Sequence, residues 1–287
     1  MKEFTLSNIN SENACKCYNQ LVKLYADFKN VEFENINIKL NAWFSANMSA
    51  VLGAILDKLS LINSISVISD NSQIISILQK NNFLANYGYQ TSPDLNDTTI
   101  KYLKLKPSES RYFYFYVINK LLSHPELPDM SNELKKKIYE SIYEIFVNAQ
   151  IHSNTDYIYT CGQFFPNKHT IEFTIVDTGV GFKKVINDRF NYSLSSIKAI
   201  KWALQDGNTT KKDTGGLGLT LLTEFIKLNK GAFQIVSDDG FYEVGETENT
   251  AFLTSPFPGT IVNMKFRTDD RNSYRLASEK CNLDDIF

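Results

Sequence analysis

Several kinds of residue are scarce in this sequence, and each shortage excludes a class of protein. Four cysteines are scattered over 287 residues, at Cys15, Cys17, Cys161 and Cys281, which is too few for a disulfide framework. Cys15 and Cys17 share a segment, but no second pair with metal-ligand spacing follows, so we interpret them as reduced thiols. The net charge is only −2, so no broad basic field indicates a nucleic-acid partner.

Long apolar runs are also missing. The N-terminus opens with Lys2 and Glu3 and has no apolar run typical of a signal peptide. No apolar stretch reaches the length that crosses a membrane. We therefore expect a cytoplasmic protein. Its hydrophobic fraction of 43% and charged fraction of 22% are typical of globular chains, and its length is enough for one large or two modest domains.

Strand and helix patterns alternate through the first hundred residues. The apolar periodicities predict elements in turn at 11–29, 31–39, 43–56, 65–68, 72–83 and 98–105. The segment 43–56 is too apolar to be an exposed helix. Alternation of this kind predicts a small α/β domain over residues 1–106.

This order of elements, with its apolar helix after a strand and the ending Gln79-Lys80-Asn81-Asn82-Phe83-Leu84, resembles the STAS-like domains that accompany bacterial regulatory kinases. The resemblance covers about residues 30–105. It would make Ser45 or Ser49 a candidate phosphoacceptor. The alternative is a packing domain with no site of its own.

A second domain is predicted over residues 107–267, followed by a polar tail at 268–287. Its helices are expected at 107–122, 131–152, 195–204 and 217–229, and its strands at 156–165, 169–176 and 259–266. The aromatic segment from Arg111 to Tyr116 is expected to pack between the two halves. Asp239-Gly240 is typical of a hairpin turn.

The helix at 131–152 has a polar stripe that helix packing does not require. Glu140, Glu144, Asn148 and His152 recur every four residues and therefore share one face. On its own, such a stripe is most simply a hydrated surface.

Two glycine motifs follow this helix. Asp177-Thr178-Gly179-Val180-Gly181 comes directly after an apolar strand, and Gly215-Gly216-Leu217-Gly218-Leu219 comes directly before a helix. Either motif alone could be a turn, because glycine supplies positive φ where the chain bends sharply. Neither matches the phosphate-loop or the dinucleotide pattern.

In this order and spacing, with Glu144-x-x-x-Asn148 ahead of them, the motifs resemble the ATP-binding domain of the GHKL superfamily. That superfamily includes the DNA gyrase B subunit, Hsp90, MutL, sensor histidine kinases and anti-sigma-factor serine kinases. The resemblance covers about residues 107–267. It implies an α/β sandwich of the Bergerat type that binds ATP and Mg²⁺.

The resemblance also implies a role for each matched residue. Asp177 would accept a hydrogen bond from the adenine amine, with Thr260 completing the contact. Glycines would let the backbone approach the nucleotide, and the second motif would bind phosphates at a helix N-terminus. The residues involved are Gly179 and Gly181 at the base, and Gly215, Gly216, Leu217, Gly218 and Leu219 at the phosphates.

On the helix, Asn148 would offer an oxygen to Mg²⁺, and Glu144 would orient or deprotonate the attacking water. Residues 183–214 would form a lid over the nucleotide, with Lys212 near the phosphates. His152 could touch the phosphate side or cap the helix, and Glu140 is expected to be solvated.

The motifs leave the reaction open. One hypothesis is an ATPase or serine/threonine protein kinase of a bacterial regulatory system, with Glu144 as general base. The other is a non-catalytic switch, in which ATP changes an interface with a regulatory protein encoded nearby; a homodimer and a role in stress or phage defence remain open. A histidine kinase is excluded because Pro125 directly follows His124, so His124 cannot lie inside a dimerising helix.

Overall fold

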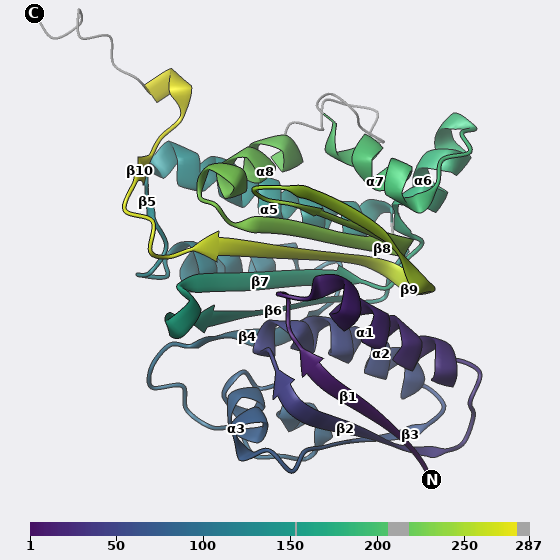
Figure 1. The fold of residues 1–287 in the computed structure, drawn as a ribbon. Helices are drawn as coiled ribbons and strands as arrows, with labels where there is room; N and C mark the ends of the chain where they lie inside the picture. The colour runs from purple at the N-terminus through teal and green to yellow at the C-terminus, as the bar shows by residue number, and fades with distance from the viewer. Residues whose placement is uncertain (153, 206–217, 280–287) are drawn as a thin grey trace, which may run out of the picture.

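The computed structural model describes residues 1–152, 154–205 and 218–279. Sheets and helices alternate in it as four layers (Figure 1). From the N-terminal end, these are a three-stranded sheet, two helices, a five-stranded sheet and a second set of helices. The expected mixed α/β class is therefore confirmed at this level.

The N-terminal sheet is wholly parallel, and helices return the chain between its strands, as parallel pairing requires. Its elements are β1 (Lys2–Ile9), α1 (Ala14–Phe28), β2 (Asn35–Phe44), the 3-10 turn η1 (Ala46–Met48), α2 (Ser49–Leu59) and β3 (Ser64–Ile68). Helix α2 is apolar on nearly every side because it lies between the two sheets. Strand β1 has no counterpart among the expected strands, since only Leu6 and Ile9 of it are buried.

The five-stranded sheet has the order β4-β6-β7-β9-β8, and all of its neighbouring strands are antiparallel. Its strands are β4 (Thr99–Leu105), β6 (Ile158–Phe165), β7 (Thr170–Asp177), β8 (Ala232–Val244) and β9 (Glu248–Arg267). Strand β4 lies within residues 1–106, the segment expected to form the N-terminal domain, but it pairs with β6, so this segment contributes a strand to the five-stranded sheet. Along the chain, α3 (Ser72–Lys80) and the turn η2 (Leu84–Tyr87) lie between β3 and β4.

The remaining helices lie on the other side of the five-stranded sheet (Figure 1). They are α4 (Ser110–Tyr116), which continues as the π-helical segment Val117–Leu122, α5 (Asn132–His152), α6 (Gly181–Phe190), α7 (Ser196–Leu204) and α8 (Gly218–Leu228). Short strands β5 (Asp129–Met130) and β10 (Ser273–Tyr274) pair with each other. The last of these lies in the segment that the sequence assigns to a polar tail.

Two expectations about local structure are wrong. Asp239-Gly240 lies inside β8, where the pairing with β9 is irregular, and the hairpin reverses at 245–247. Gly240 is needed there because a Cβ would lie 2.9 Å from the Cβ of Ser196. The aromatic segment does not pack between two halves, because Phe113 is buried on the helix side of the sheet while Tyr112 is 57% exposed.

The two faces of the five-stranded sheet have separate apolar cores. Residues such as Tyr18, Leu52 and Tyr159 fill the core toward the N-terminal layer, and Ile142 and Phe173 belong to the core toward α5. Side chains alternate between these cores along each strand. The core to which a strand's apolar residues belong therefore tells which face its polar residues occupy.

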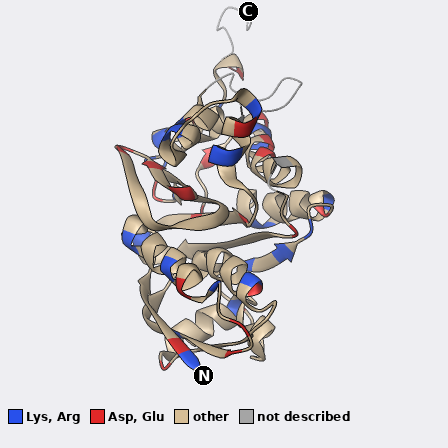
Figure 2. Ribbon diagram, turned by 90° about the vertical axis from the view of Figure 1, so that its right-hand side faces the viewer, with Lys and Arg blue, Asp and Glu red and all other residues tan. Residues whose placement is uncertain are grey.

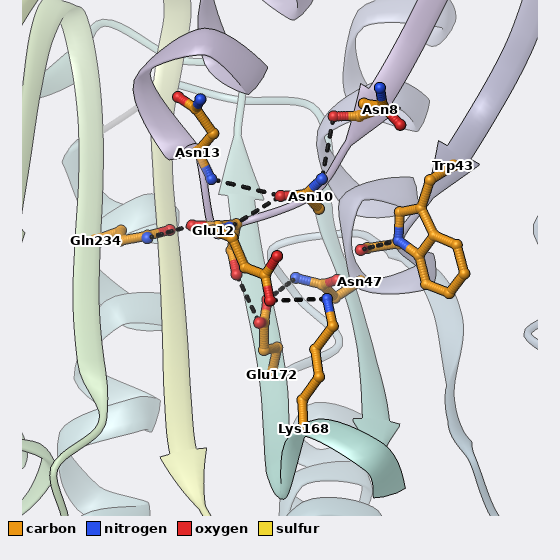
Figure 3. Close-up of polar contacts among 11 residues, drawn as sticks. Asn8, Asn10, Glu12, Asn13, Trp43, Asn47, Lys168, Glu172 and Gln234 are labelled. Carbon is orange, nitrogen blue, oxygen red and sulfur yellow. Dashed lines mark hydrogen bonds and ion pairs between the residues drawn. The ribbon is translucent and has the colours of Figure 1, made fainter.

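The face toward the N-terminal layer has a row of buried polar side chains (Figure 3). Glu172 of β7 accepts hydrogen bonds from Ser11 Oγ (2.5 Å) and Asn47 Nδ2 (3.0 Å). The Asn47 amide also reaches Thr174 and Asn263, at 3.2 Å each. Burial raises the pKa of Glu172 above its ordinary value. These bonds fix how the N-terminal layer sits on the sheet, because a buried polar group must keep its partners.

Charge is distributed without a dominant field. Lysine and arginine alternate with aspartate and glutamate over the helices (Figure 2). Among the described residues, no helix is long and apolar enough to cross a membrane. Cys15, Cys17 and Cys161 are free thiols, as expected.

Candidate functional site

A row of polar side chains lies at one end of the five-stranded sheet, on the face that packs against α5. Asp177 is the last residue of β7, Thr260 pairs with it on β9, and Ser237 pairs with Thr260 on β8. Ile175 of β7 and Val262 of β9 belong to the core toward α5, so alternation turns Asp177 and Thr260 to that face. The Ser237 and Thr260 hydroxyl oxygens are 3.5 Å apart.

Asp177 is a buried carboxylate, with 7% of its surface exposed. Its Oδ1 accepts the Gly179 N–H at 2.8 Å, and the Thr260 hydroxyl also stabilises its charge. Among the described residues, no lysine or arginine forms an ion pair with it. Burial raises the pKa of Asp177 to about 6, although the bonds from Gly179 and Thr260 and the charge of Lys58 pull it down. The carboxylate therefore lacks a partner that would fully offset its lost hydration.

Two glycines keep the backbone close around this carboxylate. Gly259 has φ +138°, and a Cβ there would lie 2.0 Å from the Asp177 carbonyl oxygen. Gly181 has φ +73°, and a Cβ there would lie 2.7 Å from Ser237 Oγ. The same Ser237 Oγ accepts the Phe182 N–H at 2.9 Å, which fixes the start of α6. The chain after Asp177 thus lies against β8 and β9, with no room for side chains at either glycine.

Helix α5 reaches the same end of the sheet. It ends at His152, and β6 begins at Ile158, which pairs directly with Asp177. In the connection, Thr155 Oγ1 accepts the Thr178 N–H and lies near the Thr178 hydroxyl, both at 3.2 Å. The C-terminal half of α5 is therefore close to the loop after Asp177.

The stripe on α5 is not uniform. Glu140 is exposed and pairs with Lys137 at 2.7 Å, which confirms the expectation that it is a surface residue. Glu144 and Asn148, one and two turns further along, are half-buried. The side chain of His152 lies outside the described residues.

Helix α8 points its N-terminus toward the same end. Its C-terminus is fixed to the far end of β9 by Asn229. The Asn229 side-chain amide donates to the Arg267 carbonyl oxygen and accepts the Arg267 N–H. Strand β8 then runs back toward Ser237, so α8 and β8 are antiparallel neighbours. Gly218, the first residue of α8, lies at the end with Asp177, and the next residue, Leu219, is buried.

The structure thus brings three of the sequence-derived parts to one end of the sheet. These are Asp177 with Gly179, Gly181 and Thr260, the half-buried Glu144 and Asn148 of α5, and the α8 N-terminus with Gly218 and Leu219. Gly215, Gly216, Leu217 and Lys212 lie outside the described residues. In the segment 183–214, which was expected to form a lid, the helix α7 was predicted from the sequence, whereas the helix α6 was not.

Sequence reasoning missed Ser237 and Thr155. Each is a single hydroxyl residue in a strand or loop, and only the register of β8 and the contact with Thr178 identify them. Ser45 and Ser49, in contrast, are unsuitable as phosphoacceptors because they are 1% and 0% exposed. Their hydroxyl oxygens accept hydrogen bonds from Trp43 Nε1 (3.1 Å) and Asn81 Nδ2 (3.0 Å).

Comparison of the chain with protein-family models found no match, and comparison with curated proteins found no relative. The site therefore has to be interpreted from its own chemistry.

Proposed function

We propose that the chain binds ATP with Mg²⁺ at the end of the five-stranded sheet, as its resemblance to the GHKL superfamily implies. The observation that carries the proposal is the buried carboxylate of Asp177, which forms no ion pair with any of the described residues. A carboxylate has room for about four hydrogen bonds, and Gly179 and Thr260 use only part of this capacity. A ligand that donates an N–H would stabilise the charged form, as the adenine amine can, whereas the keto oxygen of guanine would be repelled.

The surroundings of Asp177 fit a flat base. Gly181 and Gly259 let the chain after Asp177 pack closely against β8 and β9, which holds the carboxylate in a fixed position for a base. The Thr260 hydroxyl can donate to Asp177 and accept from a base or a water. These features select for adenine by hydrogen bonding, which discriminates more strongly than an apolar pocket does.

The phosphates would lie toward α8 and α5. A helix N-terminus binds anions through its free N–H groups and its dipole, and α8 begins at the same end of the sheet as Asp177. Asn148 and Glu144 offer oxygen atoms, the ligand type that Mg²⁺ prefers, and a protein usually holds this ion with few side chains plus substrate phosphates. The donor set on α5 therefore fits magnesium.

Two functions remain in different classes. As an enzyme, an ATPase or protein serine kinase, the chain would use Glu144 to orient or deprotonate the attacking group. As a switch, it would bind ATP without turnover and change its interface with a regulatory protein, for which the N-terminal layer is the natural contact or control element. The half-buried position of Glu144 near the phosphate end favours the enzyme.

The nucleotide is tested by calorimetric titration of the wild type and Asp177→Asn with ATP and GTP in the presence of Mg²⁺. We expect ATP to bind the wild type and GTP to bind far more weakly. Loss of a charge-assisted bond costs about 1.5–3 kcal/mol, so the variant should bind ATP roughly 10- to 150-fold more weakly. Equal ATP affinity in both proteins would refute the site.

The reaction is tested with Glu144→Gln, which keeps the size of the side chain and removes its charge. If the chain is an enzyme, the variant keeps nucleotide affinity and loses phosphate release or transfer by about 10²–10⁴-fold. Glu140→Gln, on the exposed part of the same stripe, is the matched control and should keep full turnover. Equal, slow phosphate release by the wild type and Glu144→Gln would favour the switch.

A further inference from the structure

A concave region lies far from Asp177, where the N-terminal layer meets the other end of the five-stranded sheet. It is an open groove of about 800 Å³ between helix α3, the end of β2 and the turn η4 (Pro166–Lys168). That volume is within the range of small-molecule sites, which is roughly 300–1,000 Å³.

One wall of the groove is a single face of α3. Gln73, Ile77 and Lys80 line it, and their spacing of four and three residues places them in one stripe along the helix. The other wall has Trp43 of β2, Gln163 of β6 and Asn167 of η4. The lining therefore combines side-chain amides with an indole ring and one lysine.

Trp43 is a fixed platform rather than a loose surface side chain. Its indole N–H donates to Ser45 Oγ at 3.1 Å, which sets the ring orientation (Figure 3). The residue stays 39% exposed. A flat ring can stack on such an indole, and held aromatic side chains give contact area at low cost in conformational entropy.

Gln163 contributes a fixed polar group to the groove. It is 94% buried, since only 6% of its surface is exposed, yet it lines the groove. Its Oε1 accepts the Ala46 N–H, which holds the amide in place. Its Nε2 donates to none of the described residues and is not fully buried, so it is accessible to a group in the groove.

The charge of the groove is one-sided. Lys80 is its only ionisable lining residue, and within the described parts of the chain its ammonium forms no ion pair. An anionic group on a ligand would pair with this ammonium, and the adjacent Gln73 and Asn167 amides could bond to hydroxyl or carbonyl groups.

From this set we infer that the groove binds a small ring compound that carries one carboxylate or phosphate group and several hydrogen-bonding groups. The ring stacks on Trp43, the anion pairs with Lys80, and Gln163 Nε2 donates to the polar edge. The groove is separate from the proposed nucleotide site. Gln163 lies near one end of β6, whereas Ile158, which pairs with Asp177, lies at the other end.

The test uses the fluorescence of Trp43. The chain has two tryptophans, so Trp202→Phe leaves Trp43 as the only one. This protein is titrated with three probes that share the inferred chemistry: glucose 6-phosphate, guanosine 5′-monophosphate and hippurate. We expect a saturable change in emission with at least one of them, with a midpoint below about 1 mM. No saturable change with any probe would overturn the inference.

Three further variants in the same background locate the binding. Lys80→Met should weaken it about tenfold or more, whereas Lys80→Arg, which keeps the charge, should retain most of it. Asp177→Asn should leave it unchanged. Thermal melting followed by circular dichroism shows that each variant is folded. Equal affinity of Lys80→Met and Lys80→Arg, or loss of the signal with Asp177→Asn, would assign the probe to another site and overturn the inference.

Discussion

Asp177→Asn should stabilise the free protein while it removes the proposed adenine contact. In the folded chain, burial raises the pKa of Asp177 from 3.8 to about 6. Each unit corresponds to about 1.4 kcal/mol, so the charged carboxylate costs the folded state up to about 3 kcal/mol at neutral pH. Asparagine has no charge to desolvate, and its Oδ1 can still accept the Gly179 N–H.

The sign of the effect fixes its pH dependence. Because the folded pKa is the higher one, the folded state binds more protons than the unfolded state between about pH 4 and pH 6. The stability contributed by Asp177 is therefore fully present below pH 3.8 and is lost as the pH rises through 6. The stability difference between Asp177→Asn and the wild type should be small near pH 4 and reach its plateau above pH 7.

Thermal and urea unfolding without nucleotide, at pH 4 and pH 7.5, measure this difference. We expect a gain of about 2 kcal/mol at pH 7.5, which for a chain of this length raises the melting midpoint by roughly 4 °C. Asp188→Asn, at an exposed aspartate paired with Lys184, should change stability by less than about 0.5 kcal/mol at either pH. The reasoning fails if Asp177→Asn is no more stable than the wild type at pH 7.5, or if its advantage is as large at pH 4.

Two further predictions concern stability. Asn47→Ala removes a hydrogen-bond partner of the buried Glu172 and should lower the free energy of unfolding by about 1–3 kcal/mol. Urea unfolding measures this loss. An unchanged urea midpoint would mean that the row of buried polar side chains does not hold the layers together. Gly259→Ala should be more harmful than Gly88→Ala, because both have positive φ but only at Gly259 would the new Cβ meet a backbone atom, the Asp177 carbonyl oxygen at 2.0 Å. In thermal melting, Gly88→Ala should cost about 1–2 kcal/mol and Gly259→Ala clearly more, and equal losses would show that the close approach at Gly259 relaxes freely.

The parts of the fold that depend on local pattern were predictable from the sequence. The helix period of 131–152 and the alternation of 169–176 give α5 and β7 nearly to their ends. Most of the apolar segment at 43–56 is a buried helix, as expected. Its first residues, however, belong to the end of β2 and to the 3-10 turn η1, and α2 begins only at Ser49. In each case, one segment contains the information that determines its structure.

Pairing between distant segments was not predictable. Nothing within 99–105 indicates that β4 pairs with β6, some sixty residues later in the chain, instead of extending the N-terminal sheet. Asp239-Gly240 has the composition of a hairpin turn, but β8 continues through it because β9 is long enough to pair beyond it. Here the hydrogen bonds along the longer β8–β9 pair outweigh the local preference of Asp239-Gly240 for a turn.

The candidate site also has residues that the sequence could indicate and residues that only the packing of distant segments reveals. Motif order identified Asp177 and Thr260, and the strand register then places them opposite each other. The four-residue stripe on α5 could not separate Glu140 from Glu144, because spacing does not reveal burial; the packing of α5 makes that distinction. Ser237 emerges only from the pairing of β8 with β9.

The N-terminal layer is joined to the site by more than a linker. Asp57, near the end of α2, accepts the Tyr159 hydroxyl and pairs with Lys104, both at 2.6 Å. Tyr159 points to the N-terminal layer, whereas Ile158, one residue earlier in β6, pairs with Asp177. One peptide unit of β6 therefore separates a contact made by α2 from the strand partner of the buried carboxylate. Since protein interiors are close-packed and transmit strain, a displacement of α2 is expected to be felt at the Asp177 end of the sheet.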